Sequence, residues 1–182
     1  MLKEIQQVHS TAKQIYSEAQ VEAALDNMAA AINTALAETN PLVLCVLNGG
    51  IIATGKLITR LTIPLTLDSI NATRYQNQTS GGTIQWALKP TTPLAGRTVL
   101  IIDDVLDEGI TLAAIKDYCL EQGAKDAYTA VLVDKLLDHD KPIHADFIGL
   151  KVENHYLFGY GMDYKGYLRN VAGIYACNGD VK

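Results

Sequence analysis

One short apolar run that ends in two adjacent acids constrains the fold of this chain more than any other feature. Residues 98–102 read Thr-Val-Leu-Ile-Ile, and Asp103 and Asp104 follow directly. A continuous apolar run of this length is typical of a strand buried on both faces, as in parallel sheets covered by helices. The run therefore predicts an α/β protein in which an interior strand ends directly before two acidic side chains.

Other segments favour the same architecture. Apolar runs and helical spacing predict further strands at 42–47, 63–70 and 128–133 and helices at 51–61 and 111–121. Strands that alternate with helices favour a mostly parallel sheet with right-handed crossovers. Ligands of such sheets bind beyond the carboxyl ends of the strands, so we expect the site after Leu47, Ile102 and Val133.

The two ends of the chain and its middle carry weaker patterns. Ser17 and Gln20 form a capping box pattern ahead of a helix with one apolar face. Residues 71–82 are polar and rich in turn formers, which predicts a long exposed loop, followed by a hairpin strand at 83–88. Short strands at 147–152, 156–160 and 174–176 are expected to cap the edge of the sheet.

Composition limits the classes of function. The 182 residues, 48% of them hydrophobic, suffice for one domain with a sizeable core. A net charge of -5 without a basic run disfavours nucleic acid as a partner, and no apolar stretch is long enough to span a membrane. The three separated cysteines suggest neither a disulfide framework nor a metal site. We therefore expect a cytoplasmic protein with a small diffusible ligand.

Two motifs compete as phosphate-binding sites. Gly50, Gly55 and Lys56 approach the spacing of a nucleotide-triphosphate loop, but Leu57 stands where a magnesium-binding hydroxyl is required. The segment from Asp103 to Thr111 is the stronger candidate, because its backbone amides at a helix N-terminus suit a phosphate monoester. Its acid pair suits vicinal hydroxyls, so the segment predicts a site for a ribose 5-phosphate.

Residues 99–112, Val-Leu-Ile-Ile-Asp-Asp-Val-Leu-Asp-Glu-Gly-Ile-Thr-Leu, resemble the signature of the type I phosphoribosyltransferases, which use 5-phosphoribosyl-1-pyrophosphate (PRPP). The likeness continues at 47–50, 72–75, 133–135 and from 146 to 169, where it looks like the hypoxanthine-guanine phosphoribosyltransferases. It implies a central mostly parallel sheet flanked by helices, in one domain over 1–182. It also implies a flexible loop and a small hood, formed mainly by about 135–182 with the N-terminal residues.

The resemblance assigns the site residues. Asp103 and Asp104 would bind the ribose hydroxyls, either directly or through Mg²⁺. Asp163 would help to place a second Mg²⁺. Asp107 would be the general base near N7 of the purine. The 5-phosphate would bind to the segment formed by Glu108, Gly109, Ile110 and Thr111. Pyrophosphate would contact Arg169 and the backbone amides of Asn48 and Gly49. A cis peptide at Leu47-Asn48 would present these amides. Lys135 would donate to the 6-oxo group, Tyr156 would stack on the base and the Leu157 backbone would contact its edge. Arg74 and Tyr75 would lie at the tip of a lid formed by 71–82.

Three positions depart from the family pattern. Asn48 stands where many relatives carry Lys, and Arg74 precedes the loop tyrosine where Ser is frequent. Glu108 takes a place usually held by Thr, and a carboxylate beside a phosphate is unfavourable unless it points away.

The implied activity is a magnesium-dependent transfer of 5-phosphoribosyl from PRPP to hypoxanthine or guanine, in a homo-oligomer that is a dimer or tetramer. A PRPP-sensing regulator of the same fold, a xanthine-preferring transferase and a phosphate-loop kinase are the alternatives. The lack of an added DNA-binding pattern argues against the regulator, and Leu57 argues against the kinase. Lys135 and Tyr156 favour a 6-oxopurine over another base, but they do not rank hypoxanthine, guanine and xanthine.

Overall fold

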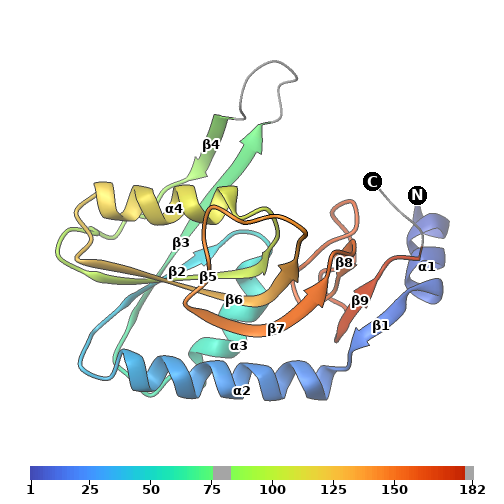
Figure 1. Cartoon of the computed structure of the whole chain (residues 1–182), viewed down its shortest axis with the longest axis horizontal. Helices are drawn as coiled ribbons and strands as arrows, with labels where there is room; N and C mark the ends of the chain where they lie inside the picture. The colour runs from blue at the N-terminus through green and yellow to red at the C-terminus, as the bar shows by residue number, and fades with distance from the viewer. Residues whose placement is uncertain (76–82, 179–182) are drawn as a thin grey trace.

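The computed structural model describes residues 1–75 and 83–178 (Figure 1). The helices are α1 (Leu2–Thr11), α2 (Glu18–Ala35), α3 (Gly50–Ile58) and α4 (Ile110–Glu121). The strands are β1 (Lys13–Tyr16), β2 (Leu42–Val46), β3 (Thr66–Tyr75), β4 (Thr83–Leu88), β5 (Thr98–Leu106), β6 (Asp126–Leu136), β7 (Phe147–Glu153), β8 (Leu157–Phe158) and β9 (Ile174–Ala176).

A six-stranded sheet in the order β4-β3-β2-β5-β6-β7 forms the centre of the molecule. Its strands are parallel except for β4, which pairs antiparallel with β3 at one edge. Helix α4 covers one face, and α2 and α3 cover the other (Figure 1). The expected α/β class with a mostly parallel sheet is confirmed.

The core explains why the interior strands are continuously apolar. Every residue of β2 is buried. Leu42 and Leu44 pack in the cluster that includes the buried side chains of α4, whereas Val43 packs in the cluster of α2 and α3. Successive side chains of a strand point to opposite faces, so a strand with helices on both sides has no position for an exposed polar residue.

Local signals in the sequence place α2 as expected. The side chain of Ser17 accepts a hydrogen bond from the Gln20 backbone, and the Gln20 side chain accepts one from the Ser17 backbone at 2.9 Å. This capping box satisfies two amide groups that the first turn of a helix leaves free. The capping pattern thus correctly located the start of the helix.

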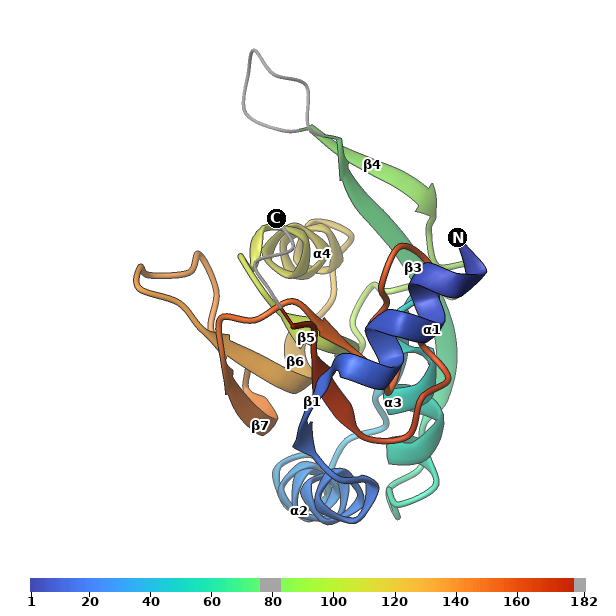
Figure 2. The same cartoon turned by 90° about the vertical axis from the view of Figure 1, so that its right-hand side faces the viewer.

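A second, three-stranded antiparallel sheet joins the two ends of the chain. Its order is β1-β9-β8, and α1 packs beside it through Ile5, which contacts a cluster containing Phe158 and Tyr164 (Figure 2). Strand β7 does not belong to this sheet, contrary to expectation, because it pairs with β6 in the main sheet. The part of the C-terminal segment outside the main sheet therefore begins after Glu153.

Two boundaries differ from expectation at the site. Residues 71–75 continue β3 instead of starting a loop, because pairing with β4 satisfies their backbone, while 76–82 lie outside the described residues. Strand β5 continues to Leu106, so Asp103 and Asp104 lie within the strand rather than after it. None of the helices in the described part of the chain is long and apolar enough to cross a membrane.

Candidate functional site

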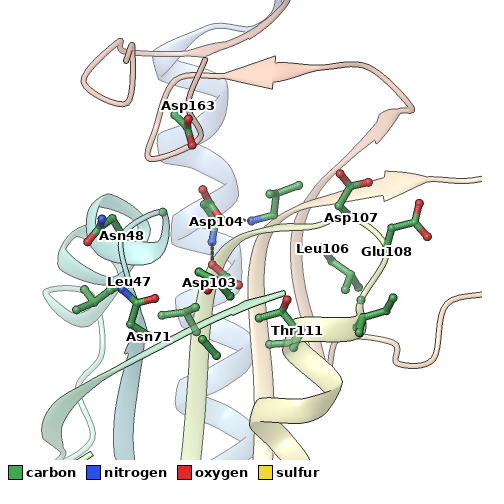
Figure 3. A pocket seen from close by; sticks show the side chains of 18 of the residues that line it. Leu47, Asn48, Asn71, Asp103, Asp104, Leu106, Asp107, Glu108, Thr111 and Asp163 are labelled. Carbon is green, nitrogen blue, oxygen red and sulfur yellow. Dashed lines mark hydrogen bonds between the residues drawn. The ribbon is translucent and has the colours of Figure 1, made fainter. Parts of the chain in front are cut away.

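A cavity of about 530 Å³ with five acidic lining residues lies at the carboxyl ends of β2 and β5 (Figure 3). We call it the larger cavity. Its lining comprises 46–49, 71–73, 103–112, Asp163 and Arg169. The cavity therefore lies where a parallel sheet is expected to bind its ligand.

The N-terminus of α4 forms one wall of the larger cavity. Gly109 precedes the helix with φ +77°, a left-handed conformation that favours glycine, and Thr111 lies in the first turn. The first amide groups of a helix lack partners within it and point toward its N-terminal end. This wall can therefore bind an anion through backbone groups and the helix dipole.

Asp103 and Asp104 form the floor of the larger cavity. The Asp104 amide donates to Asp103 Oδ1 at 2.9 Å, and the Val105 amide donates to Asp104 Oδ1 at 2.8 Å. The pKa of Asp103 is raised well above its ordinary value. Burial is the largest cause, and the neighbouring Asp104 carboxylate is the second. Burial also raises the pKa of Asp104. Such a pair gains from a ligand that supplies hydroxyl donors or positive charge.

Glycine residues allow the acid pair to be approached closely. A Cβ on Gly49 would lie 2.2 Å from Asp104 Oδ2, and a Cβ on Gly161 would lie 2.0 Å from the Gly49 carbonyl oxygen. Gly161 has φ +107° as well. Both positions therefore require glycine, and they bring the loop after β2 and the segment after β8 against Asp104.

Asp163 and Arg169 close the larger cavity from the segment after β8. Arg169 pairs with Asp163 at 2.6 Å and donates to the Gly161 carbonyl oxygen at 2.5 Å, while the Gly166 amide donates to Asp163 at 2.6 Å. Figure 3 shows Asp163 above Asp104, on the side of the cavity away from Thr111. Sequence spacing alone does not place these two residues beside β5.

A smaller cavity of about 230 Å³ adjoins the larger one. It is lined by Asp104, Val105, Asp107, Lys135, Tyr156, Leu157, Met162 and Asp163, and it shares Asp104, Val105, Asp107 and Asp163 with the larger cavity. Lys135 Nζ donates to Asp107 Oδ2 at 2.7 Å, and the Lys135 side chain is only 11% exposed. A buried ammonium group beside a carboxylate suits a ligand with neighbouring acceptor and donor atoms.

Tyr156 and Leu157 bring the second sheet to the smaller cavity. The Tyr156 ring packs edge-on against Tyr164, with centroids 5.7 Å apart. Leu157 is buried and begins β8, which pairs with β9. Burial raises the pKa of the Tyr156 phenol, so the ring enters the cavity as a neutral aromatic surface. Tyr160 and Tyr164 of the same C-terminal segment are buried.

Most of the expected site residues lie around these two cavities. The larger cavity is lined by Asn48, Gly49, Asp103, Asp104, Asp107, Glu108, Gly109, Ile110, Thr111, Asp163 and Arg169, and the smaller adds Lys135, Tyr156 and Leu157. Leu47-Asn48 is a cis peptide, as expected. Arg74 and Tyr75 end β3, next to the residues outside the described range.

Several cavity residues were missed, among them Asn71, Thr73 and Met162. Asn71 and Thr73 of β3 line the larger cavity, and Met162 lines the smaller. The polar residues of 71–75 suggested a loop, and the irregular pairing with β4 between Asn71 and Ala72 breaks the simple alternation that could have identified a strand.

Lys56 takes no part in the site. It lies on α3, where it forms an ion pair with Glu22 of α2, and its ammonium group lies 5.3 Å from the centroid of the Tyr160 ring. The similarity to a nucleotide-triphosphate loop is therefore accidental, as the sequence had indicated.

The described residues contain no group of three or more His, Cys, Asp or Glu side chains arranged to hold a metal ion. This differs from a preformed metal centre. Mg²⁺ is commonly held by one or two carboxylates together with water and the phosphates of a substrate, and the carboxylates of Asp103, Asp104 and Asp163 line the larger cavity.

Comparisons with known proteins show which family the chain resembles. Residues 11–165 match the family model described as phosphoribosyl transferase domain. The hypoxanthine-guanine phosphoribosyltransferase of Bacillus subtilis is 30% identical, over 90% of this chain and 91% of that protein. The hypoxanthine-guanine-xanthine phosphoribosyltransferase of Tritrichomonas foetus is 28% identical, over 86% of each. A crystal structure of a hypoxanthine phosphoribosyltransferase from Staphylococcus aureus superposes with a TM-score of 0.87 at 22% identity, covering 93% of both chains, which bears on the fold.

Proposed function

The chain belongs to the phosphoribosyl transferase family, and we propose that it transfers 5-phosphoribosyl from PRPP to hypoxanthine or guanine in purine salvage, giving IMP or GMP and pyrophosphate. The observation that carries the proposal is the shared wall of the two cavities. Asp104, Val105, Asp107 and Asp163 border both, so a ribose in one is adjacent to a base in the other.

PRPP fits the larger cavity through three of its groups. The 5-phosphate would bind the amides of 107–111 at the N-terminus of α4, and the ribose hydroxyls would donate to Asp103 and Asp104. Pyrophosphate would lie toward the loop at 47–49 and Arg169. The order of these walls along the cavity matches the order of the groups in the substrate.

Magnesium is part of the proposal. Asp103, Asp104 and Asp163 supply the oxygen ligands that Mg²⁺ prefers, and PRPP would complete the coordination with its own oxygens. When bound, the ion would neutralise charge on the departing pyrophosphate.

The 6-oxopurine fits the smaller cavity. Atoms N7 and O6 lie on the same edge of such a purine, and Asp107 and Lys135 lie side by side at 2.7 Å. Lys135 would donate to O6 while Asp107 accepts the proton from N7, and Tyr156 would cover the ring face. Adenine presents a donor at position 6, which the ammonium group of Lys135 would oppose.

The reaction is a displacement at C1 of the ribose. The bond from C1 to the pyrophosphate oxygen breaks, a bond from C1 to the purine nitrogen forms, and the proton of the base passes to Asp107. The protein contributes mainly by positioning the two substrates across the shared wall and by stabilising charge. The lid expected at 71–82 is not retained over its first part, because 71–75 belong to β3, and 76–82 lie outside the described residues.

Three further expectations belong to this proposal. We propose that the chain acts in the cytoplasm, as one domain over 1–182, and as a homodimer or homotetramer. Analytical ultracentrifugation would distinguish the two assemblies.

Nucleotide formation from PRPP and Mg²⁺, with hypoxanthine, guanine, xanthine or adenine supplied separately, tests the function. We expect product from hypoxanthine and guanine and none from adenine. The xanthine reaction is informative because the Tritrichomonas foetus relative is named for xanthine as well. PRPP binding without product from any base would favour the sensor alternative instead.

A further inference from the structure

The phosphate-binding segment before α4 is supported by a second loop. This loop, residues 137–146, connects β6 to β7, and we call it the β6–β7 loop. Lys141 Nζ donates to the carbonyl oxygens of Leu106 at 2.7 Å and Lys135 at 2.6 Å, and it pairs with Asp134 at 2.7 Å. The Lys141 side chain is 7% exposed. The loop is therefore fixed to the residue that ends β5.

The β6–β7 loop also contacts the segment beyond Leu106. A Cβ on Gly109 would lie 3.1 Å from Ile143 Cγ2 and 3.5 Å from Pro142 Cδ, so the two loops pack closely. His139 Nε2 lies 3.0 Å from Glu108 Oε2, and His139 Nδ1 lies 3.0 Å from Asp138 Oδ1. The β6–β7 loop thus determines where the backbone and one side chain of 107–111 lie.

Glu108 presents an electrostatic difficulty at this place. The larger cavity is lined by the carboxylates of Asp103, Asp104, Asp107, Glu108 and Asp163, and Arg169, already paired with Asp163, is its cationic lining residue. A phosphate bound at the amides of 107–111 would be repelled by a free Glu108 carboxylate. Figure 3 shows that carboxylate pointing away from Asp103 and Asp104.

We propose that His139 is a positioning residue that, as a cation, holds and neutralises the Glu108 carboxylate on the outer side of the segment, which leaves the amides of 107–111 free for the 5-phosphate. The inference rests on the proposed function, since it concerns how the same site accepts PRPP. None of the comparisons assigns a role to His139.

Two carboxylates interact with the His139 imidazole, Asp138 from the same loop and Glu108 from the segment before α4. Both carboxylates raise the pKa of His139, and the hydrogen bond with Asp138 makes the largest contribution. The imidazolium is present below this pKa and is lost as pH rises through it. The KM for PRPP should therefore rise with pH while kcat stays the same.

The expected effect is modest. The side chains of His139 and Glu108 are 52% and 55% exposed, so solvent and salt screen their interaction. We expect a change of about two- to five-fold in the KM for PRPP, and we expect it to shrink at high ionic strength.

Steady-state kinetics at pH values on both sides of neutrality, together with calorimetric titration of PRPP with Mg²⁺, test the proposal. His139→Gln should raise the KM and Kd for PRPP at low pH and flatten their rise with pH. Glu108→Gln should lower both constants and make the additional His139→Gln substitution silent. His139→Arg, a permanent cation, should keep the KM low at high pH.

His144→Gln is the matched control, because His144 lies exposed in the same loop outside both cavities. Ionisation of PRPP itself affects every variant equally, so the difference between pH profiles isolates His139. Identical profiles for wild type and His139→Gln, or additive effects of the Glu108 and His139 substitutions, would overturn the inference. A wild type that binds PRPP but forms no nucleotide would instead overturn the proposed function, and the binding titrations would still decide the role of His139.

Discussion

The larger and the smaller cavity are built from different parts of the molecule. The larger lies mainly among β2, β3, β5 and the start of α4, with Asp163 and Arg169 added from the segment after β8, and most of its charged lining residues are carboxylates. The smaller needs β6 of the main sheet together with Tyr156 and β8, and it contains a paired Lys135 and Asp107. Binding of PRPP therefore depends mainly on the geometry of the main sheet, whereas binding of the base depends more on how the second sheet packs on it.

Asp107 borders both cavities, so its substitution should have the largest effect. Asp107→Asn retains the size of the side chain but cannot accept the proton of the base, and kcat should fall by about 10²- to 10⁴-fold. Calorimetry should show PRPP binding retained. Unchanged turnover would remove Asp107 from the role of general base.

Gly49→Ala should damage the larger cavity selectively. The new Cβ would lie 2.2 Å from Asp104 Oδ2 and would displace that carboxylate, and a misplacement of about 1 Å can cost about 10²-fold in rate. The loss should appear in kcat/KM for PRPP. Gly55→Ala on α3 is the control, because no atom lies within 4 Å of its Cβ, and it should be neutral or stabilising. Equal losses in both variants would contradict the assignment.

Lys135→Ala should affect the smaller cavity instead. The loss of a charged hydrogen bond of about 1.5–3 kcal/mol predicts a decrease of at least about tenfold in kcat/KM for hypoxanthine and guanine. The Kd for PRPP should change much less, which product assays and calorimetry would show. If use of both oxopurines stayed intact, Lys135 would not contact O6.

Local patterns predicted the elements of the larger cavity well. The apolar runs of β2 and β5 identify interior strands because helices cover both faces, and the acids of β5 follow in the same segment. Strand β3 was cut short at Ile70 because its polar end is stabilised by pairing with β4, which no local pattern reports. The cis peptide, Asp163 and Arg169 came from the family resemblance alone.

Local patterns do not report contacts between distant segments, although the family resemblance implied a hood that combines about 135–182 with the N-terminal residues. Strand β1 pairs with β9, so Lys13 faces Ala176 from the other end of the chain. Neither strand has a long apolar period, and each forms because the other satisfies its backbone groups. Sequence reasoning therefore described the larger cavity more completely than the second sheet, on which the smaller one depends.

Glu22 provides the weakest but most direct test of the contact between these two regions. It lies on α2 and forms ion pairs with Lys56 and Arg60 near α3, and it accepts a hydrogen bond from the Tyr160 hydroxyl, in the segment after β8. The pKa of Glu22 is lowered from 4.5 to about 2. The hydrogen bond from Lys56 is the largest cause of this shift, and the hydrogen bond from Tyr160 also lowers the pKa. The ionised carboxylate thus stabilises the packing of the second sheet on the helices of the main one.

A lowered carboxyl pKa contributes stability that is present above pH 4.5 and is lost as pH falls toward about 2. Glu22→Gln should therefore lower the free energy of unfolding by about 1–2 kcal/mol at neutral pH, and the difference from wild type should shrink below pH 4.5. Thermal unfolding as a function of pH measures this, with the exposed Glu121→Gln on α4 as control. Because Glu22 lies outside both cavities, PRPP binding should be retained while the KM for the base rises slightly. Parallel stability curves for wild type and Glu22→Gln would show that the second sheet is held by apolar packing alone.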